Sequence, residues 1–210
     1  LSPDNNQSIV QLTIWKVQSE LTQYNDYDEA LEILQSLTAK FPIESSLLIS
    51  FVSEKSVQSK SIKWGQFCHS LINQASMVSQ EWKNQIDLLL AQLYLNNNEP
   101  DKAIQLLSNS PDSLNKNYLQ LKCSILIDPN DETLKDRLLS FIEQTENDRR
   151  VLIALCLFVA DHCNNLPQAS LDFIREVVKI SSGIEAFELR KFIYLSSIRI
   201  SSECNDIKSA

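Results

Sequence analysis

The chain has 210 residues, and its 43% content of hydrophobic residues is enough to bury a continuous core. It contains only two glycines, Gly65 and Gly183, which excludes the glycine-rich phosphate loops of P-loop and Rossmann nucleotide-binding proteins. The net charge of −8 leaves no broad cationic surface, so we expect no direct binding of nucleic acid by this segment.

The first predicted helix carries an apolar stripe. Its members recur at steps of four, three, four and three residues, a spacing that places them on one face of a helix. They are Val10, Ile14, Val17, Leu21 and Tyr24. A polar turn at Asn25-Asp26 follows the stripe and ends this helix.

A second helix is predicted directly after that turn. Asp26 can cap its N-terminus, and Glu29 stands three residues later in the capping-box position. Pro42 ends the helix, because the residue before a proline is disfavoured in the helical conformation. The apolar face comprises Ala30, Leu34, Leu37 and Phe41. The first 42 residues therefore predict an antiparallel helix pair.

Less regular helices are expected further along the chain. One of them has a recognisable apolar stripe formed by Trp64, Phe67, Leu71 and Ala75. The expected ranges are roughly 45–56, 60–78, 113–127, 131–144 and 184–201. Together with the helices that flank the polar turns, they bring the expected total to about ten or eleven.

A polar turn that enters a helix through an alanine occurs four times. The alanines are Ala30, Ala103, Ala169 and Ala210. From the first to the last there are 180 residues, or five units averaging 36 residues, close to the 34 residues of a tetratricopeptide repeat. One helix pair cannot bury both of its apolar faces, so neighbouring pairs are expected to stack and share a core.

The residues of these units resemble the tetratricopeptide motif, which has bulky residues on its first helix, small residues where helices meet, and a closing proline. Gln18 departs from the motif, which usually has glycine or alanine there, and Asp87 occupies a position expected to be apolar. The first unit matches at Ile14, Val17, Leu21, Ala30, Leu34 and Pro42. The second matches at Leu90, Ala91, Tyr94, Ala103 and Leu107, and a degenerate third has Ile153, Ala169 and Phe173.

This resemblance implies an all-α fold, a right-handed α-α superhelix of about ten or eleven antiparallel helices. We expect residues 1–210 to form a single helical-repeat region. Its repeats are expected at about 8–44, 45–80, 82–112, 113–147 and 149–182, with an incomplete repeat at 184–210. Because the chain starts without methionine and its last repeat is unfinished, we expect a longer parent solenoid.

The concave face of such a solenoid is the expected partner-binding surface. It is lined by the first helix of each pair and usually takes an extended peptide or partner helices. The candidates are polar residues that lie off the apolar packing stripe. They are Lys16, Gln18, Lys83, Gln92 and Lys122. Their orientation depends on the superhelical twist, which the sequence leaves open.

Two Cys-His dipeptides could suggest a metal site or a nucleophile pair. Cys68-His69 and His162-Cys163 both lack the i, i+3 or i, i+4 spacing with which two side chains converge from one helix. We interpret all four as ordinary partly buried or loop residues. We therefore predict no catalytic, metal-binding or cofactor-binding residues.

Two further groups of residues have simple structural interpretations. Paired carboxylates could work as an acid and a base, but Asp172, Glu185 and Glu188 are expected on the solvated faces of amphipathic helices. Exposed aromatic residues could anchor a partner, but core packing is their commoner use. We therefore expect Trp15, Trp64 and Trp82 in the core.

The five cysteines indicate a reducing compartment. Their number is odd, and Cys123 and Cys156 sit in apolar runs where a reduced thiol behaves as a small hydrophobe. We expect a cytoplasmic location, with the nucleus as the alternative. No apolar run approaches the roughly 18 to 20 residues of a membrane span, so no membrane insertion is expected.

Several stretches resemble the large tetratricopeptide-repeat subunit of the signal recognition particle. They are Asp28 to Leu31 running on to Pro42, Leu47 to Ile49, Asp101 to Leu107, and the spacing from Ala169 to Ala210. The resemblance implies a non-catalytic scaffold in a cytosolic ribonucleoprotein for protein targeting, gripping the companion large subunit of the particle. The basic RNA-contacting tail of that family has no match in this chain.

Three alternatives stay open at this stage. The chain could be a scaffold of the meiotic chromosome axis or another large nuclear assembly, or a structural spacer between other domains. It could also be an all-α enzyme, which would require a pocket that gathers His69 or His162 with a cysteine and carboxylates. The identity of the partner and the oligomeric state are not determined by the sequence.

Overall fold

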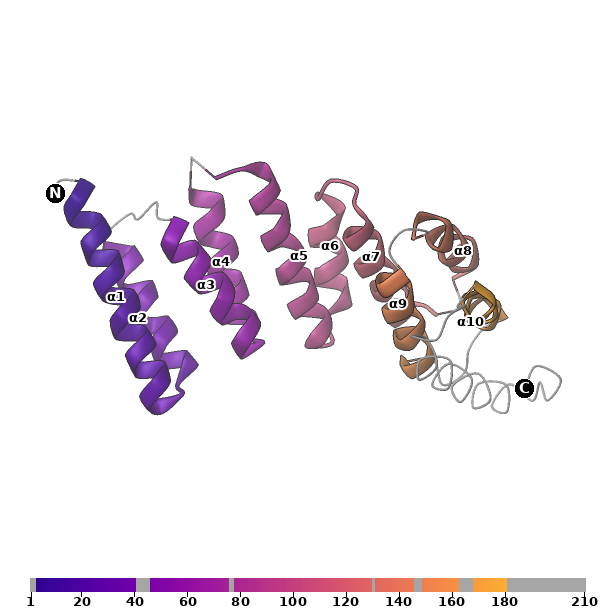
Figure 1. Ribbon diagram of the computed structural model, residues 1–210, viewed down its shortest axis with the longest axis horizontal. Coiled ribbons are helices and arrows are strands. Elements are labelled where there is room, and N and C mark those ends of the chain that lie inside the picture. Colours follow the sequence, from indigo (N-terminus) through magenta and orange to yellow (C-terminus); the bar gives the residue numbers. More distant parts are fainter. Residues whose placement is uncertain are drawn as a thin grey trace. The chain divides into compact units, whose positions relative to one another are not determined.

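The computed structural model describes residues 3–40, 46–75, 78–129, 131–145, 149–162 and 168–180. These residues form ten α-helices and contain no strand, which confirms the all-α prediction (Figure 1). The predicted helix at 184–201 and the incomplete repeat at 184–210 lie outside the described residues. The helices are α1 (Pro3–Tyr24), α2 (Tyr27–Lys40), α3 (Ser46–Ser59), α4 (Ile62–Gln74), α5 (Gln80–Asn96), α6 (Pro100–Ser108), α7 (Leu114–Ile127), α8 (Leu134–Gln144), α9 (Arg149–His162) and α10 (Gln168–Ile180).

Local hydrogen bonds explain where the helix boundaries agree with the prediction and where they shift. α7 begins at Leu114, as expected, because the Ser113 hydroxyl accepts the backbone N–H of Lys116 at 3.2 Å. α8 begins later than the predicted residue 131. There the Asp131 carboxylate accepts both the backbone N–H and the hydroxyl of Thr133 at 2.9 Å, which forms a turn in place of a helix.

The asparagine turn has the same backbone feature in the two copies that the structure describes. Asn25 has a φ of 53° and Asn98 a φ of 59°, in the left-handed region that asparagine tolerates better than most residues. After Asn25, the Asp26 carboxylate accepts the backbone N–H groups of Asp28 and Glu29, each at 3.0 Å. The predicted N-cap of α2 is therefore confirmed.

The chain divides into two compact units, Leu1–Asn97 and Asn98–Ala210, named here the N-terminal unit and the C-terminal unit. Within the described residues, each unit has its own cluster of buried hydrophobic side chains. The arrangement of both units as one right-handed superhelix stays a prediction from the repeat spacing.

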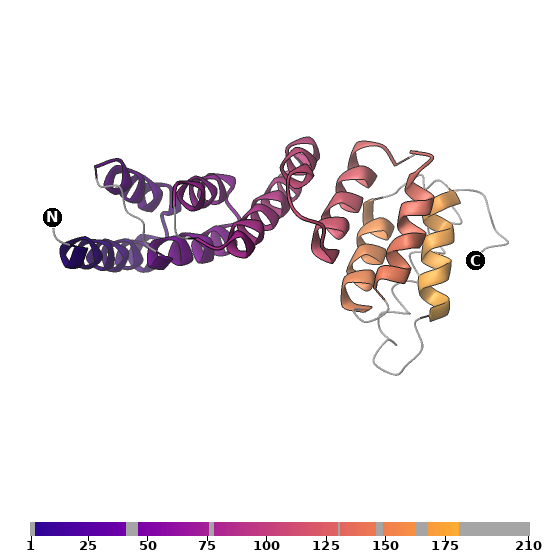
Figure 2. The same cartoon turned by 90° about the horizontal axis from the view of Figure 1, so that it is seen from above.

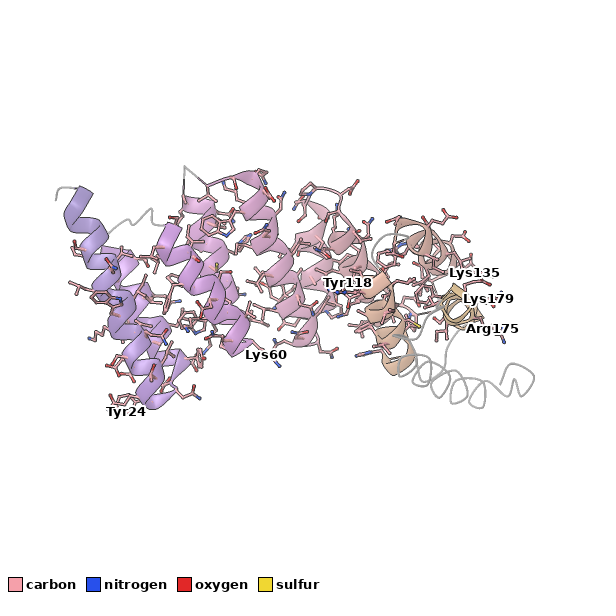
Figure 3. All side chains as sticks on the ribbon, in the orientation of Figure 1. Tyr24, Lys60, Tyr118, Lys135, Arg175 and Lys179 are labelled. Carbon is pink, nitrogen blue, oxygen red and sulfur yellow. The ribbon has the colours of Figure 1, made fainter. Side chains whose placement is uncertain are left out.

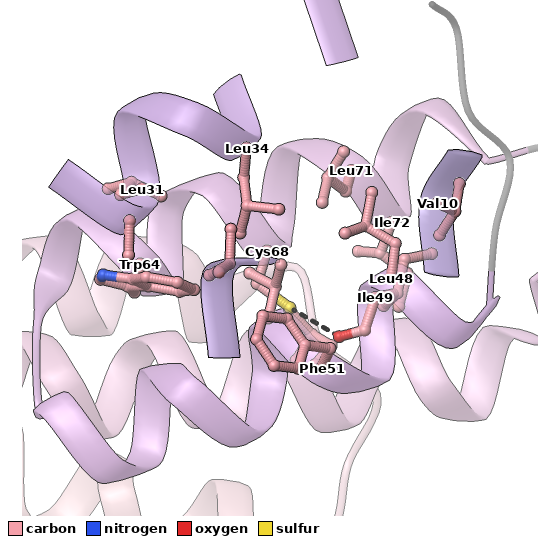
Figure 4. Close-up of a cluster of buried hydrophobic side chains, with 14 of the residues drawn as sticks. Val10, Leu31, Leu34, Leu48, Ile49, Phe51, Trp64, Cys68, Leu71 and Ile72 are labelled. Atoms are coloured by element: carbon pink, nitrogen blue, oxygen red, sulfur yellow. Dashed lines mark hydrogen bonds between the residues drawn. The ribbon is translucent and has the colours of Figure 1, made fainter. Parts of the chain in front are cut away.

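In the N-terminal unit, α1 packs on α2 and α3, and α4 packs against both α3 and α5. Trp64 of α4 is fully buried at the centre of this core (Figure 4). Its Nε1 donates to the carbonyl oxygen of Tyr27 in α2 at 2.9 Å, and the two rings meet edge to face with centroids 6.1 Å apart. One turn further along α4, the Cys68 thiol donates to the carbonyl oxygen of Ile49 in α3 at 3.8 Å. Trp64 thus joins α4 to α2, and Cys68 joins it to α3.

Gly65 allows α4 and α5 to approach closely. A Cβ atom at this position would lie 2.5 Å from Leu93 Cδ1 and 3.1 Å from Leu90 Cδ1, both on α5. Real Cβ atoms do not come that close to a neighbour, so any larger residue would displace Leu93. The glycine therefore has a packing role inside a helix, where it is otherwise unfavourable.

The apolar stripe of α1 is only partly confirmed. Val10, Val17 and Leu21 are buried and Ile14 packs against them, as predicted. Tyr24 is 62% exposed, so its assignment to the packing face is wrong. It is the last residue of α1, where its hydroxyl accepts a hydrogen bond from Gln23 at 2.8 Å (Figure 3).

In the C-terminal unit, α6 packs on α7, and the four helices α7 to α10 share one core (Figure 2, pink to yellow). α7 pairs with α8, and α9 pairs with α10. The first helices of the two pairs, α7 and α9, contact each other, and so do the second helices, α8 and α10. Phe141 of α8, Leu155 of α9 and Phe173 of α10 are almost completely buried in this core. This contact pattern is the one expected of two stacked helix pairs.

Candidate partner-binding surface

The predicted binding residues lie in different environments. Lys16 and Gln18 are exposed on α1, whereas Lys83 and Gln92 are half-buried on α5. The Gln92 amide donates to Asn96 on the same helix at 2.7 Å. Their role in binding a partner stays a prediction.

The prediction that Lys122 lies off the packing face is wrong. Its residue surface is only 8% exposed, and its ammonium group lies 4.5 Å from the ring centroid of Phe158 in α9 and 5.2 Å from that of Tyr118. The apolar stem of a lysine can pack in a core when aromatic faces receive its charge. Burial lowers the pKa of Lys122, and Lys122 serves the α7–α9 contact and not an open surface.

A groove of about 510 Å³ lies between α2 and α4 in the N-terminal unit. The residues that line it follow the same i, i+3, i+4, i+7 spacing on both helices, so each set occupies one helix face. On α2 they are Asp28, Leu31, Glu32 and Gln35, and on α4 they are Lys63, Gln66, Phe67 and Ser70. Leu31 is buried and Phe67 half-buried, which gives the groove an apolar floor beneath a polar rim.

The charge of this α2–α4 groove is negative overall, with two carboxylates and one ammonium group. The Lys63 ammonium donates to the Asp28 carboxylate across the groove at 2.9 Å. This hydrogen bond and the nearby charge of Asp28 raise the pKa of Lys63, with a smaller contribution from Glu32. The excess carboxylate makes the groove suited to a positively charged group.

A second groove, of about 360 Å³, lies between α7 and α8 in the C-terminal unit. Its rim is rich in uncharged amides, and the Asn117 amide donates to Gln144 across it at 2.8 Å. Arg137 donates to the Ser124 hydroxyl of α7 at 3.0 Å. Leu121 and Phe141, which form its floor, are buried core residues. Hydrogen bonds between side chains of α7 and α8 thus cross this groove. Its two charged lining residues, Asp136 and Arg137, carry opposite charges.

Cys68 and His69 lie in different surroundings. Cys68 is completely buried, and burial raises the pKa of its thiol to about 12. His69 lies on the adjacent face, where its Nε2 is 3.1 Å from the Asp87 carboxylate of α5 and Asn73 contacts its ring. The polar Asp87 in an expected apolar repeat position is thus explained by an interhelix contact with a histidine.

Only some of the other candidates for chemistry lie in the part of the chain that the structure describes. His162 stacks on Phe158 with ring centroids 4.0 Å apart, and its partner in sequence, Cys163, lies outside the described residues. Asp172 accepts from Lys135 of α8 at 2.8 Å and lies 3.5 Å from Arg175, so it joins α10 to α8. Figure 3 labels Lys135 and Arg175. Glu185 and Glu188 lie outside the described residues. Among the residues that are described, no three His, Cys, Asp or Glu side chains gather as a metal site would require.

The tryptophan prediction is confirmed at two positions and wrong at one. Trp64 is fully buried and Trp82 packs half-buried against the N-terminal core. Trp15 is 62% exposed, and Leu12, one turn before it, is 61% exposed. Both lie on the side of α1 opposite the buried stripe. The signal was present in the sequence, because Leu12 and Trp15 are out of phase with Val10, Val17 and Leu21.

In the described part of the chain, none of the helices combines the length and the apolar character needed to cross a bilayer. Comparison with protein-family models, with curated proteins and with solved structures yields no match to this chain.

Proposed function

We propose that the chain is a non-catalytic scaffold that binds a segment of a partner protein in the α2–α4 groove. The observation that carries the proposal is the groove itself, with its apolar floor, polar rim and excess of carboxylate between the second helices of two neighbouring pairs. Apolar floors with a few placed polar groups are the usual form of binding sites on proteins.

The geometry of the groove favours a short extended segment with a basic side chain. From Asp28 to Gln35 the groove runs about 10 Å along α2, because a helix rises about 1.5 Å per residue. An extended chain rises about 3.3 Å per residue, so three to four residues fit. A Lys or Arg of that segment would approach Glu32 and Asp28, while an apolar neighbour would lie on Phe67.

The thiol chemistry of the chain supports a scaffold over an enzyme with a cysteine nucleophile. Cys68, Cys123 and Cys156 are buried and unpaired. Burial raises their thiol pKa values to about 12, 11 and 12, so these groups stay protonated near pH 7. A protonated, inaccessible thiol is a poor nucleophile. The three reduced cysteines also favour a cytoplasmic or nuclear location.

The family resemblance supplies the first partner to test. The sequence resembles the large tetratricopeptide-repeat subunit of the signal recognition particle, and in a scaffold of that type the companion large subunit would provide the bound segment. The alternative is that the chain is a scaffold of the meiotic chromosome or of another large nuclear assembly. Segments of partner proteins from either assembly can be titrated in the same way as the model peptide described next.

A peptide titration tests the groove directly. A fluorescent hexapeptide of alternating lysine and leucine should bind the chain saturably, and a glutamate–leucine hexapeptide should not. Glu32→Lys should weaken binding at least about tenfold, because it reverses the charge that recognises the peptide. Glu143→Lys makes the same charge change on exposed α8 in the other unit and should leave binding within about twofold. Equal binding by both variants would refute the groove as the site.

A further inference from the structure

Among the described residues that line the α2–α4 groove, Lys63 is the only one with a positive charge. It reaches from α4 across to α2, where its ammonium group donates to the Asp28 carboxylate at 2.9 Å. The other α4 residues of the lining, Gln66, Phe67 and Ser70, are uncharged. Asp28 thus already holds a cation before any partner segment arrives.

Glu32, the second carboxylate of the groove, has no such partner. It is exposed one turn further along α2, and no lysine or arginine of the described residues forms an ion pair with it. Lys63 lies close enough to be affected by its charge, but donates to Asp28 instead. Glu32 is therefore the carboxylate that a basic side chain of a partner can bind without displacing a cation of the groove.

The two carboxylates have the spacing of alternate residues in an extended chain. Asp28 and Glu32 are four residues apart on α2, which is about 6 Å along the helix axis. Side chains at positions i and i+2 of an extended segment point to the same side and lie about 6.6 Å apart. Without the Lys63 ammonium group, the groove could therefore accept two basic side chains of one segment.

With Lys63 present, a second basic side chain of the partner must replace it at Asp28. Both side chains of the Lys63–Asp28 pair are well exposed, at 69% and 70%, so the pair is weak enough to be replaced. The exchange ends with the same number of contacts between ammonium groups and carboxylates as before. The second basic residue therefore adds almost no affinity.

We propose that Lys63 is a specificity-determining residue of the α2–α4 groove, which makes the groove recognise one basic residue of the partner segment, at Glu32, and remain indifferent to a second. This inference rests on the proposed function and names the class of segment that the groove prefers. Replacement of Lys63 by an uncharged residue would convert the groove to a site for two basic residues at positions i and i+2.

Three hexapeptides titrated against the whole chain test this inference. All have alternating glutamine and leucine, with lysine at the third position only, at the third and fifth, or at the third and fourth, where the two side chains point to opposite sides. The wild type should bind the first two within about twofold, the statistical advantage of two equivalent lysines. Lys63→Gln should bind the third-and-fifth peptide at least about fivefold more tightly than the one-lysine peptide, and the third-and-fourth peptide within about twofold of it.

Two further variants separate the contact from a general effect of charge. Lys60→Gln removes an exposed positive charge three residues before Lys63 and outside the groove lining, so it should behave as the wild type. Lys60 and Lys63 are both exposed, so neither substitution should disturb the fold. Asp28→Asn added to Lys63→Gln should abolish the fivefold gain, because the second carboxylate is lost.

The outcomes distinguish the role of Lys63 from the groove itself. An equal gain from the second lysine in the wild type and in Lys63→Gln, or a gain that survives Asp28→Asn, would refute the role of Lys63 and leave the groove as the binding site. Absence of binding by every peptide to every variant would refute both.

Discussion

The junction of α2 with α4 and the junction of α8 with α10 are equivalent places in the two units, because each joins the second helices of neighbouring pairs. Each also carries a Lys–Asp contact between the two helices, Lys63 with Asp28 at 2.9 Å and Lys135 with Asp172 at 2.8 Å. The N-terminal contact is well exposed beside an open groove, whereas Asp172 is only 27% exposed and Phe141 and Phe173 are buried in the shared core. The N-terminal junction thus bears an open groove, and the C-terminal junction has a less exposed ion pair.

The bulk of Trp64 explains part of this difference. Its buried ring fills the space beneath α2. Its Nε1 donates one hydrogen bond to the Tyr27 carbonyl oxygen, which joins α4 to α2. Beyond the ring, the rim residues of α2 and α4 are polar and leave the groove open.

The largest expected effect comes from truncating the central side chain of the open junction. Trp64→Ala should lower the free energy of unfolding by about 3–5 kcal/mol, because it leaves a cavity and removes the hydrogen bond between Trp64 and the Tyr27 carbonyl. Native-state hydrogen exchange should show the loss in α1 to α5. Phe173→Ala, the matched truncation in the other unit, should lower protection in α7 to α10. Identical exchange patterns for the two variants would contradict two separate cores.

Overfilling the α4–α5 contact should have the next largest effect. Gly65→Val places a side chain where Leu93 Cδ1 lies 2.5 Å from a Cβ, so we expect a loss of about 1–3 kcal/mol. Gly65→Val combined with Leu93→Ala should recover part of that loss, because the second change makes room. Urea denaturation of both variants measures the coupling. Additive losses would show that Gly65 does not set the helix spacing.

The buried thiols predict a loss of stability at alkaline pH in both units. Burial raises the pKa of Cys68 in the N-terminal unit and of Cys156 in the C-terminal unit from 9.0 to about 12. Each thiol therefore contributes stability that is fully present below pH 9. Between pH 9 and about 12 the thiol ionises in the unfolded chain but not in the folded one, so this stability is lost as the pH rises. The slope is about 1.4 kcal/mol per pH unit for each thiol.

Alanine variants isolate this effect. The stability difference between the wild type and Cys68→Ala, measured by urea denaturation, should shrink between pH 9 and 10.5, and Cys156→Ala should behave in the same way. A difference that is constant with pH would show that the thiol ionises equally in the folded and unfolded chains.

The smallest expected effect is the loss of stability when either of two helix N-caps, Asp26 or Ser113, is replaced by alanine. Asp26 accepts two backbone N–H groups at the start of α2, whereas Ser113 accepts one at the start of α7. Asp26→Ala should therefore destabilise by about 1–2 kcal/mol and Ser113→Ala by about 0.5–1 kcal/mol. Thermal unfolding followed by circular dichroism can rank them. A larger loss at Ser113 would contradict the hydrogen-bond geometry of the two caps.

Local features of the fold could be predicted from the sequence, because periodicity and capping depend on neighbouring residues. The α1–α2 turn, the Asp26 cap and the range of α7 follow from such patterns. Periodicity tells which residues share a face, but it does not tell whether another helix covers that face. For this reason the burial of Trp15 and Tyr24 was predicted wrongly.

The candidate site was harder to predict, because it depends on contacts between residues far apart in the chain. The α2–α4 groove requires the spacing that Trp64 sets between two helices more than thirty residues apart. Lys122 was expected at the surface from its charge, but two aromatic rings on α7 and α9 give its ammonium group a buried environment. Neither arrangement can be derived from residues within one helix.

A hydrogen-exchange footprint of the bound lysine–leucine hexapeptide on the whole chain tests the central claim most directly. The account predicts added protection in α2 and α4 around residues 28–35 and 63–70, where the groove is open, and none in α8 and α10. Protection confined to α8 and α10, or absent from α2 and α4 at saturating peptide, would contradict it.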